Sequence, residues 1–397
     1  MADVRVRAEH ISVLDDMRYY CERPQTPVAL GIFQKFASHG NKQSALLEGA
    51  LFLHTELPVR IAMGAQFLDK MPRGLGGLQA FQEVRALFTT SFQDVRAFNF
   101  SQPPNVEDES RFHEILSTIQ IRHKRVPEAI ALGCEALRAQ LELIHGESWW
   151  DSAERKEIQQ LLEGFFLSRV GIRFLVGQQM KLHSQYYDGV TSSNMFGLVD
   201  LQTNPHRLVK SAISSVERMA MASFGACPNI TLKCTSDITF VQVAYHIKFI
   251  TIRLLRHAIQ NTLACYGLEK VKAGEAPGIT VTVADGPDNE DLCICVMDEG
   301  GGLPRSKVRY LWSYLHEDGE ERDWEWVATS EEDNQFGESF GLPLARLRAR
   351  LFGGDVKVQT MESYGLLTFA YIKKFDDAEL LPERYSEVFE AEDDESG

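Results

Sequence analysis

The sequence predicts an α+β protein with an N-terminal bundle of α-helices, followed by an α/β sandwich whose mixed sheet carries helices on one face. Two observations favour this order. Between about residues 25 and 183, apolar residues recur at helical spacing without a strand signal. Beyond about residue 187, helical segments alternate with runs of β-branched residues. We therefore expect a helical domain over 1–183, an α/β domain over 184–375 and an acidic tail over 376–397.

Length and composition agree with two folded domains. The chain has 397 residues, of which 44% are hydrophobic and 24% are charged. No stretch approaches the roughly 20 uninterrupted apolar residues of a membrane span, so none is expected. The net charge of -15 argues against a nucleic-acid partner, because binding to phosphate backbones rests on clustered Lys and Arg.

The seven cysteines are scattered, and their odd number indicates neither a disulfide framework nor a zinc site. Cys293 and Cys295 alternate along one predicted strand. We expect both on one face of the sheet as core residues, not as metal ligands.

In the first half, amphipathic helices are predicted around residues 45–67, 130–144 and 158–182. Pro58 comes one residue into the apolar segment that begins at Leu57. Because proline suits the first turn of a helix, we expect a helix to start there.

In the second half, two alternating β-branched runs between Ile279 and Asp298 predict a hairpin with its turn at 285–290. Helices are expected at 209–224, at 242–266 before the hairpin, and at 342–352 after it. The tail is acidic and poor in large apolar residues, so we expect it to be mobile or wrapped on a partner.

Two glycine motifs flank the end of this hairpin. Asp298 ends the second strand and leads into Gly300 and Gly302, which is an arrangement that can bind an adenine amino group and let backbone approach a ligand. The second motif contains Gly337, Ser339 and Gly341 immediately before a helix, whose N-terminal amides can face phosphate. Neither motif is specific by itself, since such turns also occur as ordinary hairpin exits.

Together, in this order and on this hairpin, the motifs resemble those of the GHKL class of ATPases. Further stretches narrow the resemblance to the mitochondrial pyruvate and branched-chain 2-oxo acid dehydrogenase kinases; they are ELPVRIA (56–62), IRHKRVPEAIALG (121–133), LSRVGIRFLVGQQ (167–179) and FGLPLARLRARLFGGDVKVQTMESYG (340–365). The resemblance extends from about residue 11 to residue 374.

This resemblance implies a helical regulatory domain and a GHKL nucleotide domain that commonly forms a homodimer. It also implies a place in the mitochondrial matrix, although no transit peptide is legible. The implied partner is the lipoyl domain or core of a 2-oxo acid dehydrogenase complex, whose decarboxylase subunit such kinases phosphorylate on serine.

The chain departs from the family on the helix before the hairpin. Family members carry there a Glu as general base and, four residues later, an Asn that binds Mg²⁺. With the register set by Ala258 and Thr262, these positions are Arg253 and His257. Arg253 cannot accept a proton, and imidazole is a poor ligand for Mg²⁺. Neighbouring Arg256 keeps a positive charge that the family also has.

The remaining departures concern the rest of the pocket. Asn261 lies one turn beyond His257 and is a possible substitute Mg²⁺ ligand. Ser339 replaces a glycine of the second motif, and Leu366 replaces a threonine whose role Thr368 could take over. The loop between the motifs is rich in acidic residues, which disfavours ATP. One hypothesis is that Arg253 pairs with an acid of this loop.

Less specific interpretations stand beside these. Arg253 and His257 could belong to an ordinary solvated helix face. Trp149 and Trp150 are expected to pack at a helix end rather than to anchor a partner, and His123 is expected to make an inter-helix or capping hydrogen bond.

The sequence therefore predicts a pseudokinase: a family member that acts as a binding or regulatory subunit, with weak binding of ATP or ADP and doubtful Mg²⁺ binding. One alternative is an active protein serine/threonine kinase that uses Asn261 and a carboxylate of the acidic loop. Another is a structural subunit of a larger mitochondrial assembly.

Overall fold

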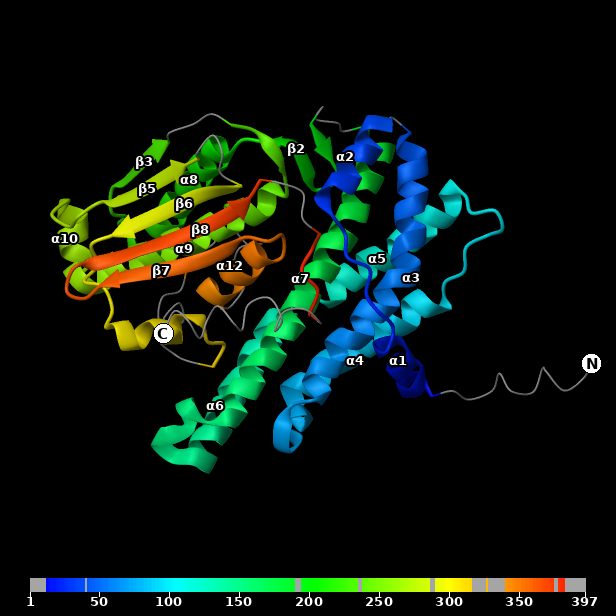
Figure 1. The fold of residues 1–397 in the computed structure, drawn as a ribbon, viewed down its shortest axis with the longest axis horizontal. Coiled ribbons are helices and arrows are strands. Elements are labelled where there is room, and N and C mark those ends of the chain that lie inside the picture. The colour runs from blue at the N-terminus through cyan, green and yellow to red at the C-terminus, as the bar shows by residue number, and fades with distance from the viewer. Residues whose placement is uncertain are drawn as a thin grey trace, which may run out of the picture.

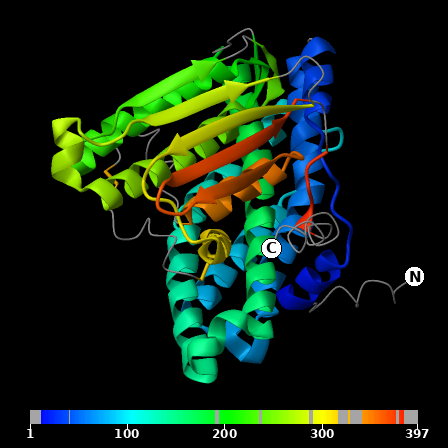
Figure 2. The same ribbon diagram turned by 60° about the vertical axis from the view of Figure 1, so that its left-hand side comes forward.

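The computed structural model describes residues 12–39, 41–189, 194–234, 238–285, 290–315, 326–327, 340–374 and 378–382. Two regions lie side by side, one of long helices and one of strands layered with helices (Figure 1). Figure 2 shows the same two regions after a turn, with the sheet facing the viewer. The expected α+β class is confirmed.

The helical region consists of α1 (Val13–Cys21), α2 (Leu30–His39), α3 (Lys42–Asp69), the 3-10 helix η1 (Pro72–Gly77), α4 (Gln79–Ala97), α5 (Val106–Arg122), α6 (Val126–His145), the 3-10 helix η2 (Gly146–Asp151) and α7 (Ala153–Tyr187). Side-chain caps define several starts. Asn105 and Asp108 form a reciprocal capping box at α5, and the Ser152 hydroxyl accepts the Arg155 amide at α7. The long helices α3 and α7 pack against each other.

The expectation that Pro58 starts a helix is wrong, because Pro58 lies inside α3. Proline has no N–H to donate to the carbonyl one turn earlier, which normally ends or kinks a helix. Here the residues on both sides of it, including Leu57 and Ile61, are fully buried. Packing of this face thus keeps the helix continuous through the proline.

The α/β region consists of β1 (Met195–Phe196), β2 (Val199–Thr203), α8 (Pro205–Phe224), β3 (Ile230–Cys234), β4 (Phe240–Gln242), α9 (Ala244–Tyr266), α10 (Leu268–Ala273), β5 (Ile279–Ala284), β6 (Asp291–Asp298), the 3-10 helix η3 (Arg305–Trp312), α12 (Gly341–Arg350), β7 (Asp355–Met361) and β8 (Gly365–Lys373). Its larger sheet has the order β3-β5-β6-β8-β7, with β3 and β5 parallel and the other neighbours antiparallel. The predicted hairpin is the β5–β6 pair. Gln242, expected to open α9, ends β4 instead.

One face of the larger sheet is covered by α8, α9 and α12 (Figure 1). Along β6 the buried residues alternate with half-buried ones, and Asp298 is on the buried side. Cys293 and Cys295 share one face, as predicted, but they are half-buried on the side opposite the helices. Their expected place in the core is therefore wrong, because the alternation of side chains assigns the core side to Leu292, Ile294 and Val296.

Part of the predicted tail is docked on the protein itself. Ala378 forms a bridge with Ala29, and Glu379 is 4% exposed. The Glu379 amide donates to the Val28 carbonyl at 3.0 Å, and the Leu380 amide donates to the Leu351 carbonyl at 2.7 Å. Residues 378–382 thus connect the two regions, which corrects the expectation of a mobile or partner-wrapped tail for this segment. The rest of the tail lies outside the described residues.

Candidate functional site

Helix α9 presents buried basic residues at the predicted catalytic positions. Arg253 is 1% exposed and Arg256 is 6% exposed, whereas His257 is half-buried. A solvated helix face would leave the Arg253 guanidinium in water, so that interpretation is wrong for Arg253. The sequence places charge on α9, and the fold then buries it.

The surroundings of these arginines are aromatic. The guanidinium carbon of Arg253 lies 5.0 Å from the centre of the Phe249 ring, and that of Arg348, on α12, lies 4.0 Å from the same ring. Arg256 lies 4.7 Å from the Trp326 ring centre. Ring faces carry negative charge density and stabilise cations at such distances. Phe249 and Arg348 were not singled out in the sequence, and only the one-turn spacing of Phe249 and Arg253 could have indicated their contact.

Asp298 lies at the end of β6 and is 2% exposed. One of its oxygens accepts the Gly300 amide at 2.9 Å, and the other accepts the Asn261 amide group at 3.5 Å. Burial raises the pKa of this carboxyl group to about 6, although these hydrogen bonds and one from the Leu366 backbone favour the charged form. A carboxylate held by amides alone keeps acceptor capacity for another donor.

Asn261 faces Asp298 and His257 together. Its amide nitrogen lies 3.5 Å from the Asp298 carboxylate and 3.3 Å from Nδ1 of His257. An amide oxygen in that position would face a carboxylate, so the assignment of the nitrogen is the favourable one. The Asn261 amide is therefore engaged by its own chain.

The glycines of the first motif are required by contacts within the protein. A Cβ on Gly300 would lie 2.6 Å from the backbone of Asn261, and one on Gly302 would lie 2.2 Å from the Met361 carbonyl oxygen. Gly302 also has a φ of +62°. Close packing of the turn on α9 and on the β7–β8 connection thus accounts for both glycines without a ligand.

The other predicted pocket residues fall into two groups. Thr368 is buried on β8 on the same face as Leu366, which pairs with Asp298. Gly341 is buried as the first residue of α12. Gly337 and Ser339 lie outside the described residues, as do the acidic loop residues and therefore the suggested loop partner of Arg253.

Comparison with known proteins places this arrangement in a family. Residues 27–200 match the family described as mitochondrial branched-chain alpha-ketoacid dehydrogenase kinase, and residues 246–374 match that of histidine kinase-, DNA gyrase B- and HSP90-like ATPases. The chain is 30% identical over 375 residues to the mitochondrial pyruvate dehydrogenase (acetyl-transferring) kinase of Arabidopsis thaliana, covering 93% of this chain and 96% of that protein. Isozyme 1 of Homo sapiens is 26% identical, with 92% and 81% covered.

The chain belongs to the mitochondrial 2-oxo acid dehydrogenase kinase family. Its α/β region is that of the GHKL ATPases, a class defined by nucleotide-binding members. The expected mitochondrial location is confirmed by these relatives, which are named as mitochondrial. Among the described helices, none combines the length and apolar character that a bilayer crossing requires.

Two expectations of ordinary packing are confirmed. His123 lies between α5 and α6, and its Nε2 is 2.9 Å from the Ser91 hydroxyl oxygen on α4. Trp150 is buried in η2 and packs edge-on against Tyr310 at 4.4 Å. These contacts within the fold explain both residues.

Proposed function

We propose that this member of the kinase family is a pseudokinase that acts as a binding or regulatory subunit of a 2-oxo acid dehydrogenase complex in the mitochondrial matrix. The observation that carries the proposal is the burial of Arg253, a guanidinium at the position that the resemblance assigns to the family's general base. Arginine stays protonated at any physiological pH, so it cannot take the proton of a substrate hydroxyl.

The metal position supports the same conclusion. Mg²⁺ prefers hard oxygen ligands in an octahedron, and the residues at hand are His257 and Asn261. The imidazole of His257 offers nitrogen, and Asn261, whose amide nitrogen faces Asp298 and His257, offers at most one amide oxygen. These residues do not fit the ion, and phosphoryl transfer depends almost wholly on positioning and charge stabilisation. Loss of both groups is therefore expected to abolish transfer.

The adenine end of the pocket fits a nucleotide better. Asp298 retains acceptor capacity beside its amide donors, and the Gly300–Gly302 turn is intact. We therefore propose that ATP or ADP binds weakly through its adenine group, with no contribution from Mg²⁺.

The proposed partner is a protein. The names of the relatives describe kinases of pyruvate dehydrogenase, and the helical region of this chain matches the family over residues 27–200. We propose that this region docks on the lipoyl domain or core of such a complex, and that the α/β region forms a homodimer.

The test combines calorimetric titration with nucleotide and a transfer assay. We expect ATP to bind with the same affinity in Mg²⁺ and in EDTA, and we expect no labelled phosphate to reach a dehydrogenase complex. The matched variant carries Arg253→Glu and His257→Asn, which restore the family's groups. It should gain Mg²⁺-dependent nucleotide binding.

The alternatives give different results. Phosphate transfer by the unaltered protein that stops in Asn261→Ala would establish the active kinase with a displaced metal ligand. Absence of nucleotide binding, together with co-purification in a large complex, would instead establish the structural subunit.

A further inference from the structure

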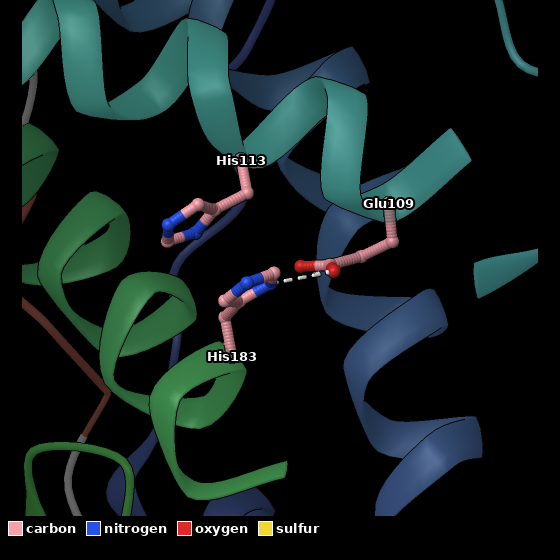
Figure 3. A group of neighbouring side chains, drawn as sticks. All are labelled: Glu109, His113 and His183. Carbon is pink, nitrogen blue, oxygen red and sulfur yellow. Dashed lines mark hydrogen bonds and ion pairs between the residues drawn. The ribbon is translucent and has the colours of Figure 1, made fainter. Parts of the chain in front are cut away.

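A cluster of side chains that the kinase chemistry does not use lies where α5 meets the end of α7. Glu109 and His113 are one turn apart on α5, and His183 projects toward them from α7 (Figure 3). Each residue offers one ligand atom, and these atoms lie within 4.8 Å of one another. The i, i+4 spacing on α5 brings the first two residues onto one helical face.

Glu109 is a buried acid with little positive charge around it. Its side chain is 1% exposed; one oxygen accepts the Gln179 amide group at 2.9 Å, and the other lies 2.8 Å from Nδ1 of His183. In the part of the chain that the structure describes, no lysine or arginine forms an ion pair with it. A buried carboxylate needs a compensating cation, which can be a proton on His183 or a metal ion.

His113 is suited to donate a lone pair. Its Nδ1 is buried, and no described group forms a hydrogen bond with it. Its ring stacks on that of His183, with centres 3.6 Å apart and planes inclined by 12°. Burial lowers the pKa of His113, and the neighbouring His183 lowers it further. A ring nitrogen without a hydrogen-bond partner is free to bind a metal.

We propose that Glu109, His113 and His183 form a binding site for a divalent transition-metal ion such as Zn²⁺. One carboxylate and two imidazoles are a common protein ligand set for Zn²⁺, with water completing the coordination. Gln179 holds the second carboxylate oxygen and also donates to the Leu46 carbonyl at 3.0 Å. It therefore orients the ligand from α3 and α7, as residues behind a metal ligand commonly do.

Binding requires a small rearrangement. Imidazole lone pairs lie in the ring plane, so two stacked rings must tilt apart to direct their nitrogens at one ion. The ion also takes the place of the hydrogen bond between His183 and Glu109. The site would join α5 to the end of α7 in the helical region, far along the chain from the Arg253 helix. It is thus independent of the proposed loss of catalysis.

The test uses the full chain without a histidine tag, freed of metal by a chelator, and titrated with zinc chloride by calorimetry. We expect one ion per chain. His113→Ala removes a ligand but no described hydrogen bond, so it should fold normally and weaken Zn²⁺ binding by at least about tenfold. Co²⁺ as a second probe should give d–d absorption bands that shift or disappear in the same variant.

The matched control is His206→Ala, which removes an exposed histidine of α8 outside the cluster and should leave Zn²⁺ affinity unchanged. Glu109→Gln keeps the shape of the side chain and should weaken binding as His113→Ala does. The inference is overturned if His113→Ala binds Zn²⁺ as tightly as the unaltered chain, or if His206→Ala loses as much affinity.

Discussion

Two buried carboxylates, Glu379 near the C-terminus and Asp298 at the end of β6, meet very different surroundings. Glu379 is 4% exposed and Asp298 is 2% exposed. Glu379 accepts from two guanidinium nitrogens of Arg60, at 3.0 and 2.5 Å, and from the Val28 amide at 3.1 Å. Asp298 accepts from amide groups alone, and burial raises its pKa to about 6.

The difference separates a structural acid from a binding acid. Arg60 also bonds to Glu56 at 2.8 Å and to the Thr26 carbonyl at 2.8 Å, so its charge is shared between α3 and the docked segment 378–382. Burial lowers the pKa of Arg60, but Glu379 and Glu56 outweigh this effect and raise it. Every charge in this cluster has a partner of opposite sign. Asp298 lacks such compensation among the described residues, which is typical of a position that receives a ligand.

The largest expected effect comes from breaking the first cluster. Arg60→Met keeps an unbranched side chain but leaves Glu56 and Glu379 buried without their cation. We expect the free energy of unfolding to fall by about 3 to 5 kcal/mol in urea denaturation near neutral pH. Arg125→Met is the control, because the Arg125–Glu128 pair is exposed and screened by water, so its loss should leave stability nearly unchanged. Equal losses of unfolding free energy in the two variants would show that the buried cluster does not hold segment 378–382 to α3.

A smaller effect of opposite sign is expected for Asp298→Asn. The raised pKa means that the folded state binds a proton more tightly than the unfolded chain between about pH 4 and 6. The unaltered protein therefore loses stability as the pH rises through this window, and the asparagine variant does not. We expect the variant to be more stable by about 3 kcal/mol at pH 8 and equally stable below pH 4, as measured by denaturation across pH.

Asp355→Asn is the matched control for that experiment. Asp355 is also buried, which raises its pKa, but Arg346 and Arg350 outweigh burial and lower it. Its contribution to stability is therefore present above the unfolded pKa and lost as the pH falls. The Asp355 variant should be less stable at pH 8, with the difference shrinking in acid. The comparison would be contradicted if Asp298→Asn and Asp355→Asn changed stability at pH 8 in the same direction.

The sequence predicted the helices, strands and residue positions that depend on residue periodicity and local chemistry. The β5–β6 hairpin follows from alternating residues around a turn, and α9 follows from its apolar spacing. The alternation also predicts the position of Asp298 at the end of the strand. Residues two apart in a strand face the same side of the sheet, so Asp298 is buried on the same side as Val296.

Long-range packing was not predictable from the same patterns. Pro58 lies in the middle of a helix because neighbours distant in sequence bury its face, and Glu379 is held by a residue 319 positions earlier. The burial of Arg253 was not predictable either, because it depends on how α9 packs against α12, whose Arg348 contacts the same Phe249 ring as Arg253. The cluster of Glu109, His113 and His183 likewise needs two helices, although the one-turn spacing of its first two members is visible in the sequence.

The smallest expected effect sharpens the contrast at Asp298 itself. In Asn261→Ala, Asp298 loses the amide that occupies one of its oxygens, and the pKa of its carboxyl group should rise further, because that hydrogen bond favours the charged form. An adenine amino group then meets a carboxylate without a competing donor. One hydrogen bond contributes roughly 0.5 to 1.5 kcal/mol, so we expect ADP affinity, measured by calorimetry in EDTA at pH 8, to increase between about twofold and tenfold. Thr262→Ser, one residue along α9 with its hydroxyl bonded to the Ala258 carbonyl, is the control and should leave ADP affinity unchanged. Weaker ADP binding in Asn261→Ala would mean that Asn261 helps to hold the nucleotide, and Asp298 would then resemble Glu379 as an acid satisfied by its own chain.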